Sequence, residues 1–119
     1  MSALHLTLKR AYEPAADDDG RRVLVDRLWP RGLEKHRAAI AEWNKDVAPS
    51  PALRKWFNHD PARWLEFRRR YTEELRVNPA VRRLHDIAAD EPVTLLYGAR
   101  DEKHNHALVL AEYLRSELQ

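Results

Sequence analysis

Apolar and polar residues follow one another along the chain in a pattern typical of short strands connected by helices. Residues 4–9 alternate apolar with polar side chains, which predicts a strand buried on one face. Residues 21–28 and 93–97 contain short apolar runs that suit buried strands of a parallel sheet. Residues 13–20 are rich in turn-forming and acidic residues, and we expect an exposed loop there.

The middle of the chain carries helical spacings and residues that start helices. Apolar residues three and four apart predict a helix over residues 38–47. Ser50, followed by proline, predicts the N-cap of a short helix over residues 51–57. Asp60 predicts the N-cap of the next helix in the same way. The apolar stripe of that helix consists of four residues: Trp64, Phe67, Tyr71 and Leu75.

Two further helices complete the pattern. Asn78, again followed by proline, predicts the start of one of them. The apolar face of the last helix consists of five residues: Ala107, Leu108, Ala111, Leu114 and Leu118. We find no repeat, low-complexity segment or domain boundary. The sequence therefore predicts a single α/β domain over residues 1–119, with a small, mostly parallel sheet flanked by helices in a Rossmann-like arrangement.

Composition narrows the class of protein. The 119 residues can bury one core without covalent cross-links, and 44% hydrophobic with 34% charged residues is typical of soluble globular proteins. The absence of cysteine excludes disulfides, thiolate metal ligands and cysteine nucleophiles. No apolar stretch approaches the roughly 20 residues that span a bilayer, and the N-terminus lacks the organisation of a signal peptide. We expect no membrane association and a cytoplasmic location.

Polar residues gather where the second strand is predicted to end. Asp26 and Arg27 stand at that point, with Trp29 and Arg31 just beyond it. Ligands of open α/β sheets bind beyond the carboxyl ends of the strands, and neighbouring strand residues point to opposite faces. One interpretation is that the arginines bind a phosphate or carboxylate while Asp26 orients them or acts as a base. The other is that Asp26 pairs with an arginine and fixes the loop.

A second polar cluster follows the strand over residues 93–97. Asp101 is expected to cap the last helix, which would place His104 at its third position and direct the first amides at an anion. Arg100 and Asn105 would contact that anion, His104 would act as acid or base, and the hydroxyl of Tyr97 would assist. Alternatively, Asp101 only caps, and His104 or Asn105 ties the helix start to a neighbouring loop.

A metal site is not predicted. His104 and His106 are two residues apart, and on a helix such side chains point about 200° away from each other. They would converge only in an extended segment, with His59 or Asp101 completing the ligand set. The sequence leaves open whether any cofactor binds.

Several blocks together resemble a known bacterial family. They are VDRLWPRG at residues 25–32, LRKWF at 53–57, HDP at 59–61 and HNHA at 104–107. The chain is identified on these blocks as a member of the YeaO-like DUF488 family, and the resemblance covers nearly its whole length. Because DUF488 denotes a domain of unknown function, the resemblance implies no reaction.

Three functions are compatible with these features. The sequence favours a small enzyme that uses general acid/base chemistry on an anionic, phosphorylated or nucleotide-like metabolite. Its expected residues are those of the two clusters: Asp26, Tyr97, Asp101 and His104 for catalysis, and Arg27, Trp29, Arg31, Arg100 and Asn105 for binding. The alternative is a non-enzymatic module that binds an anion or a partner. Nucleic-acid binding is disfavoured, because the net charge is only +2. The oligomeric state is left open.

Overall fold

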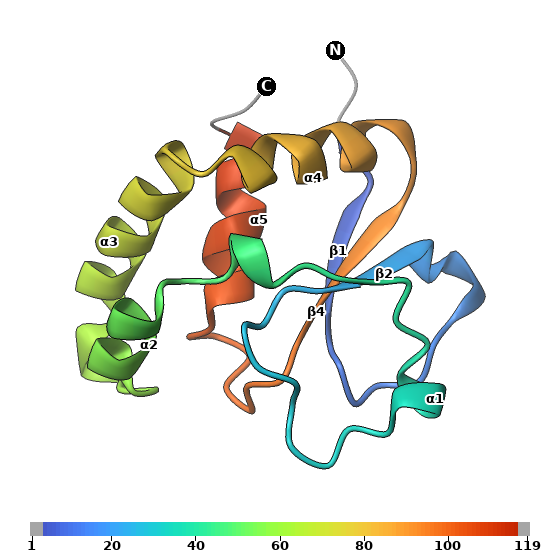
Figure 1. Ribbon diagram of the computed structural model, residues 1–119, viewed down its shortest axis with the longest axis horizontal. Coiled ribbons are helices and arrows are strands. Elements are labelled where there is room, and N and C mark those ends of the chain that lie inside the picture. Colours follow the sequence, from blue (N-terminus) through green and yellow to red (C-terminus); the bar gives the residue numbers. More distant parts are fainter. Residues whose placement is uncertain (1–3, 117–119) are drawn as a thin grey trace.

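A computed structural model describes residues 4–116 of the chain (Figure 1). Its centre is a four-stranded sheet in the order β1-β4-β2-β3, and every neighbouring pair is parallel. The strands are β1 (Leu6–Arg10), β2 (Arg21–Leu24), β3 (Glu42–Trp43) and β4 (Val93–Tyr97). The α/β class and the parallel sheet predicted from the sequence are confirmed. Leu118, placed on the last predicted helix face, and residues 1–3 lie outside the described residues.

The described part of the chain forms five α-helices beside the sheet. They are α1 (Lys35–Ala38), α2 (Pro51–Phe57), α3 (Trp64–Arg76), α4 (Pro79–Asp90) and α5 (His106–Ser116). Three short 3-10 helices lie at Asp17–Asp19, Lys45–Val47 and Pro61–Arg63. Within residues 4–116, none of these helices is long and apolar enough to cross a membrane.

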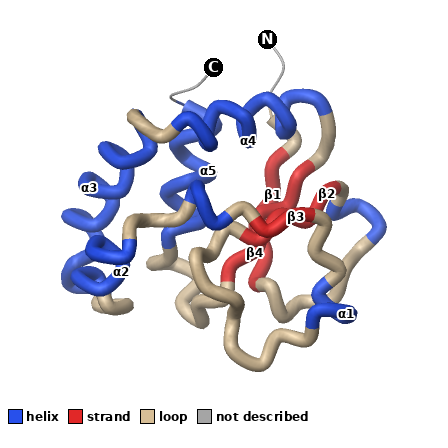
Figure 2. The backbone as a smooth tube through the Cα atoms, viewed as in Figure 1, coloured by secondary structure: helices blue, strands red, loops and turns tan. Residues whose placement is uncertain are grey.

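The two faces of the sheet are covered differently. Helices α2, α3 and α5 gather on one side of the strands, whereas loops and α1 lie on the other (Figure 2). Alternate residues of the central strands, such as Val23 and Leu95, belong to the large core cluster on the helical side. Leu24 and Leu96 point the other way into a small cluster beneath the segment that follows β2. Because both faces are covered, all five residues of β4 are buried.

Three of the predicted N-caps are confirmed. The side chain of Ser50 accepts a hydrogen bond from the amide three residues on, at 3.2 Å. Asp60 and Asn78 each accept from the amide two residues on, at 3.0 Å in both cases. Asp60 caps the 3-10 turn that leads into α3, and Asn78 caps α4. These caps could be predicted because a capping residue directly before a proline is typical of the start of a helix.

The prediction of a single helix over residues 38–47 is wrong. The chain there leaves α1 through Ala39 in the left-handed region, at φ 47°, and then forms β3 and a 3-10 turn. Glu42 and Trp43 pair with β2 and complete the edge of the sheet. The Trp43 Nε1–H donates to the carbonyl of Asp26 at 2.8 Å. Long-range pairing therefore overrides the helical spacing of this segment.

The loop predicted to be exposed over residues 13–20 contains a buried carboxylate. Asp19 is only 6% exposed and pairs with Arg22 at 2.7 Å and Lys9 at 2.9 Å. Burial opposes its ionisation, but hydrogen bonds from the Ala16 amide, Lys9 and Arg22 prevail and lower the pKa of Asp19 to about 2. The acidic residue thus neutralises Arg22, which is itself only 3% exposed.

Candidate functional site

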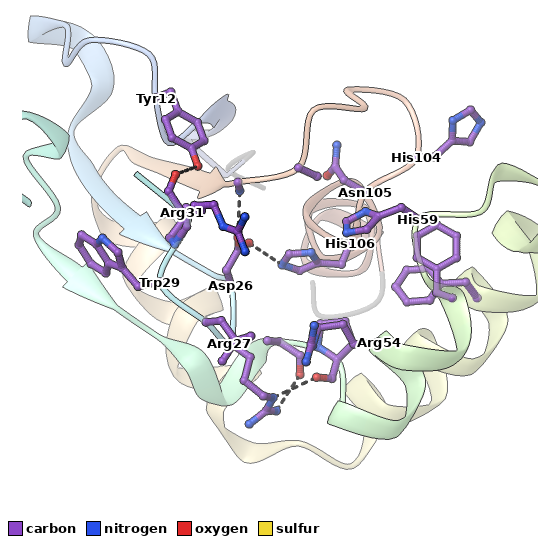
Figure 3. Close-up of a pocket in the computed structure, with 18 residues that line it drawn as sticks. Tyr12, Asp26, Arg27, Trp29, Arg31, Arg54, His59, His104, Asn105 and His106 are labelled. Carbon is purple, nitrogen blue, oxygen red and sulfur yellow. Dashed lines mark hydrogen bonds and ion pairs between the residues drawn. The ribbon is translucent and has the colours of Figure 1, made fainter. Parts of the chain in front are cut away.

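A pocket of about 300 Å³ opens beyond the carboxyl ends of β2 and β4 (Figure 3). Its lining comes from the segment after β2, from α2 and the turn after it, and from the loop between β4 and α5. The two polar clusters of the sequence therefore lie on one pocket. They are joined directly, because the amide of Gly98 donates to Asp26 Oδ2 at 2.9 Å.

Asp26 and His106 face each other on the lining of this pocket (Figure 3). His106 Nε2 lies 3.0 Å from the carbonyl oxygen of Val25 and 3.3 Å from Asp26 Oδ1. A carbonyl only accepts hydrogen bonds, so Nε2 carries a proton in this arrangement. Asp26 consequently pairs with a histidine, and not with an arginine as the loop-fixing interpretation expected.

The surroundings of Asp26 perturb its ionisation. Burial raises the pKa of Asp26, and this effect outweighs the lowering by His106, the Gly98 amide and His59. Its Oδ1 is inaccessible to solvent and has no hydrogen bond within the described part of the chain. A buried carboxyl group beside a histidine in a pocket is typical of functional sites.

His104 lines the same pocket but is held by other groups. Its Nδ1 lies 2.8 Å from Asp101 Oδ2, and its ring packs edge-on against Trp64 with 5.4 Å between the centroids. In Figure 3 the ring stands well apart from Asp26 and His106. His104 is thus held within its own loop and against α3, and not at the start of α5 as both interpretations expected.

Asp101 does not cap α5, in contrast to the prediction. Its Oδ1 accepts from the amides of Lys103 and His104, at 2.9 and 3.0 Å, within the loop. The hydrogen bonds from Lys103 and His104 lower the pKa of Asp101. The helix begins at His106, and Asn105 caps it by accepting from the Leu108 amide at 3.2 Å. The loop between β4 and α5 therefore ends four residues later than a cap at Asp101 would place its end.

The arginines expected to bind an anion are placed differently from one another. Arg27 donates to the carbonyl oxygens of Pro49 and Ala48, at 3.2 and 3.3 Å, so its guanidinium is already engaged. Arg31 lines the pocket, and within residues 4–116 its guanidinium makes no hydrogen bond or ion pair, whereas its backbone oxygen accepts from the Tyr12 hydroxyl at 2.6 Å. Arg100 is exposed and does not belong to the lining.

The remaining predicted residues are Tyr97 and Trp29. Tyr97 is 4% exposed, burial raises its pKa, and it does not belong to the pocket lining. Trp29 does line the pocket. Its Nε1–H donates to the carbonyl of Leu33 at 2.9 Å, and its ring packs edge-on against Trp43. Trp29 therefore forms a fixed wall.

Comparison with known proteins agrees with the sequence blocks. A family model described as "DUF488-N3i: Inactive DUF488-N3 subclade" matches residues 5–119. The chain belongs to the DUF488 family. It is 47% identical over 114 residues to "Uncharacterized protein YeaO" of Escherichia coli K12, covering 95% of this chain and 99% of that protein.

Mycobacterial proteins show a similar likeness to this DUF488 chain. "Uncharacterized protein Rv3073c" of Mycobacterium tuberculosis H37Rv is 45% identical over 105 residues, which covers 88% of this chain and 89% of that protein. "Uncharacterized protein Mb3100c" of Mycobacterium bovis matches with the same figures. No solved structure matches the chain with significance.

Sequence reasoning did not single out Arg54 of this DUF488 domain, and it weighed His59 and His106 as possible metal ligands. Arg54 lines the pocket from α2, and its guanidinium makes no hydrogen bond or ion pair within residues 4–116. His59 lines it from the turn after α2 and adopts a left-handed conformation at φ 54°. Such a backbone is uncommon for histidine and occurs often at ligand sites. Within the described residues, no three His, Cys, Asp or Glu side chains converge to hold a metal ion.

Proposed function

We propose that this DUF488 protein binds a small organic anion in the pocket beyond β2 and β4, as a non-enzymatic binding module. The observation that carries the proposal is the pair of arginines on the lining, Arg31 and Arg54. Neither guanidinium has a protein partner within residues 4–116. An arginine fork suits the geometry of a carboxylate or phosphate, and two such forks at one cavity favour an anionic ligand.

The contrast with other arginines strengthens this proposal. On the helical surface Arg68, Arg69 and Arg70 pair with glutamates at 2.7 to 2.8 Å. Arg83 pairs with Glu42 in the same way at 2.7 Å. Those charges are locally neutralised, whereas the pocket keeps two cationic groups available to a ligand.

The walls of the pocket add an apolar surface for the body of the ligand. Phe57 and Phe67 stack with 4.2 Å between their centroids, and both belong to the lining. Pro30 and Pro49 contribute further apolar area. A cavity of about 300 Å³ with aromatic walls and a few convergent polar groups suits a small ring-bearing anion better than a bare ion.

Two observations favour binding over catalysis. His104, the expected acid or base, is held by Asp101 and Trp64, and Tyr97 is not on the lining. The family description also calls this subclade inactive. General acid/base chemistry on the anionic metabolite remains a second candidate, and the Asp26–His106 pair is the observation that favours it. A cytoplasmic location remains a prediction.

Isothermal titration calorimetry with phenyl phosphate, benzenesulfonate and inorganic phosphate tests the binding function. We expect at least one ring-bearing probe to bind, and Arg31→Ala and Arg54→Ala each to raise its Kd about tenfold, the effect of losing a charged hydrogen bond. Arg82→Ala is the matched control, because Arg82 is an exposed arginine of α4 outside this lining.

The variant Arg100→Ala distinguishes this proposal from the sequence-based prediction, in which Arg100 contacts the anion. Since Arg100 lies outside the lining, we expect the variant to bind like the control. Binding that is unaffected by Arg31→Ala and Arg54→Ala, or the absence of binding by all three probes, would contradict the proposed function.

A further inference from the structure

We propose that the anion binds together with one proton, which the ring of His106 takes up beside the carboxylate of Asp26 at the pocket. This inference rests on the proposed function. In it, the cationic ring of His106 faces the ligand, and Asp26 is the positioning residue for that ring. The juxtaposition that carries it is the 3.3 Å separation between Asp26 Oδ1 and His106 Nε2 on the lining of the cavity.

The ring of His106 is fixed by groups outside the pocket. His106 is the first residue of α5, directly after the capping residue Asn105. Its Nε2–H donates to the Val25 carbonyl at 3.0 Å, and its ring packs edge-on against Tyr71 with 6.2 Å between the centroids. Because Nε2 keeps its proton in this arrangement, a further proton is taken up at Nδ1 and makes the ring cationic.

Asp26 is equally fixed. Its Oδ2 accepts from the Gly98 amide at 2.9 Å. This approach is close enough that a Cβ atom on Gly98 would lie 3.0 Å from Oδ2 and 3.0 Å from Pro30 Cβ. The carboxyl group therefore cannot turn away from His106 without losing the Gly98 hydrogen bond, and a buried carboxylate needs a compensating charge.

The charge of the pair depends on one proton. Without it, the pair carries a single negative charge, and with it the pair is neutral. A bound anion repels the negative state, so binding favours proton uptake and the affinity must fall as the pH rises. Other charged or titratable groups line the same pocket or pack against the pair: Tyr12, Arg27, Arg31, Arg54, His59, Tyr71 and His104.

Among these, His59 is the group most able to imitate the effect. It lines the pocket and lowers the pKa of Asp26 through its charge, yet it has no hydrogen bond within residues 4–116. His104 is already held by Asp101 at 2.8 Å. The experiment must therefore separate protonation of the Asp26–His106 pair from protonation of His59.

Calorimetry with benzenesulfonate from pH 6 to pH 9 provides the test, because the charge of this probe does not change in that range. Each pH is measured in two buffers of different ionisation enthalpy, which yields the number of protons taken up. In the wild type we expect uptake approaching one proton and a Kd that rises toward about tenfold per pH unit at the alkaline end. Asp26→Asn removes the carboxylate that stabilises a cationic His106 ring. We therefore expect the ring of this variant to stay neutral, and its Kd to change less than about twofold per pH unit.

His106→Gln is the second variant, because glutamine can still donate to the Val25 carbonyl but cannot titrate. We expect no proton uptake in it, while His59→Gln retains the uptake of the wild type. Wild-type binding without proton uptake, uptake that persists in both pair variants, or uptake lost in His59→Gln alone would overturn the inference and leave the binding function standing. A lack of binding at pH 6 would remove both.

Discussion

At the scale of single residues, the buried carboxyl group of Asp26 lines the pocket but lowers the free energy of unfolding when it is ionised. Its folded-state pKa is raised, so its ionisation destabilises the fold once the pH exceeds the unfolded value of about 3.9. The penalty is absent below that pH and complete above the folded pKa. We expect Asp26→Asn to melt at a higher temperature than the wild type at pH 7, and at the same temperature near pH 3.5. Circular dichroism melts across this range check it, and a less stable variant at pH 7 would contradict it.

Asp19 is the opposite case among the buried carboxylates. Its pKa is lowered to about 2, so the stability it contributes is present above about pH 4 and is lost as the pH falls toward 2. Asp19→Asn leaves the buried Arg22 without its anion, and we expect a loss of about 3 kcal/mol in the free energy of unfolding at pH 7. Asp18→Asn, an exposed neighbour with the same charge change, is the control and should remain close to the wild type in urea unfolding.

At the scale of elements, the residue that caps α5 differs from the predicted one: the sequence predicted Asp101, and in the structure Asn105 caps the helix. Asn105 accepts from the Leu108 amide and donates to the Asp101 carbonyl, whereas the Asp101 side chain serves only the loop. We expect Asn105→Ala to destabilise the protein by about 1 kcal/mol and to speed hydrogen exchange at the Leu108 amide. Asp101→Ala should leave that exchange rate unchanged. The reverse outcome would restore the predicted cap.

The elements that the sequence predicted correctly are those determined by local chemistry. Ser50, Asp60 and Asn78 each precede a proline, and the runs that became β2 and β4 are buried on both faces. The two-residue strand β3 could not be predicted, since it exists only through its pairing with β2. The start of α5 was ambiguous because Asp101 and Asn105 are both good capping residues.

Local sequence patterns likewise predicted only part of the candidate site. The sequence located both polar clusters and assigned residues of both to one function, and parallel strand ends do lie at one edge of a sheet. It preferred His104 over His106 because a supposed cap at Asp101 placed His104 in the first turn. The pairing of His106 with Asp26 depends on where the first residue of α5 meets the segment that follows β2, and no local pattern encodes that.

At the scale of the whole molecule, three distant segments build one cationic, aromatic-walled pocket. Residues near positions 26–31, 54–59 and 98–106 converge there, while the arginines of α3 are paired with glutamates. Because the attraction is electrostatic at an exposed mouth, we expect the affinity for benzenesulfonate to weaken between 20 and 300 mM salt, about threefold or more. Titrations at both salt concentrations check this, and a salt-independent Kd would indicate that the apolar walls alone bind the probe.

The most direct test of the binding pocket is a chemical-shift map of the ¹⁵N-labelled protein titrated with phenyl phosphate. We expect the largest shifts at the amides of Gly98, Ala99, Asn105 and His106 and at the Trp29 indole, all on the pocket lining. Shifts gathered on the arginine-rich surface of α3, or no saturable shifts at all, would contradict it.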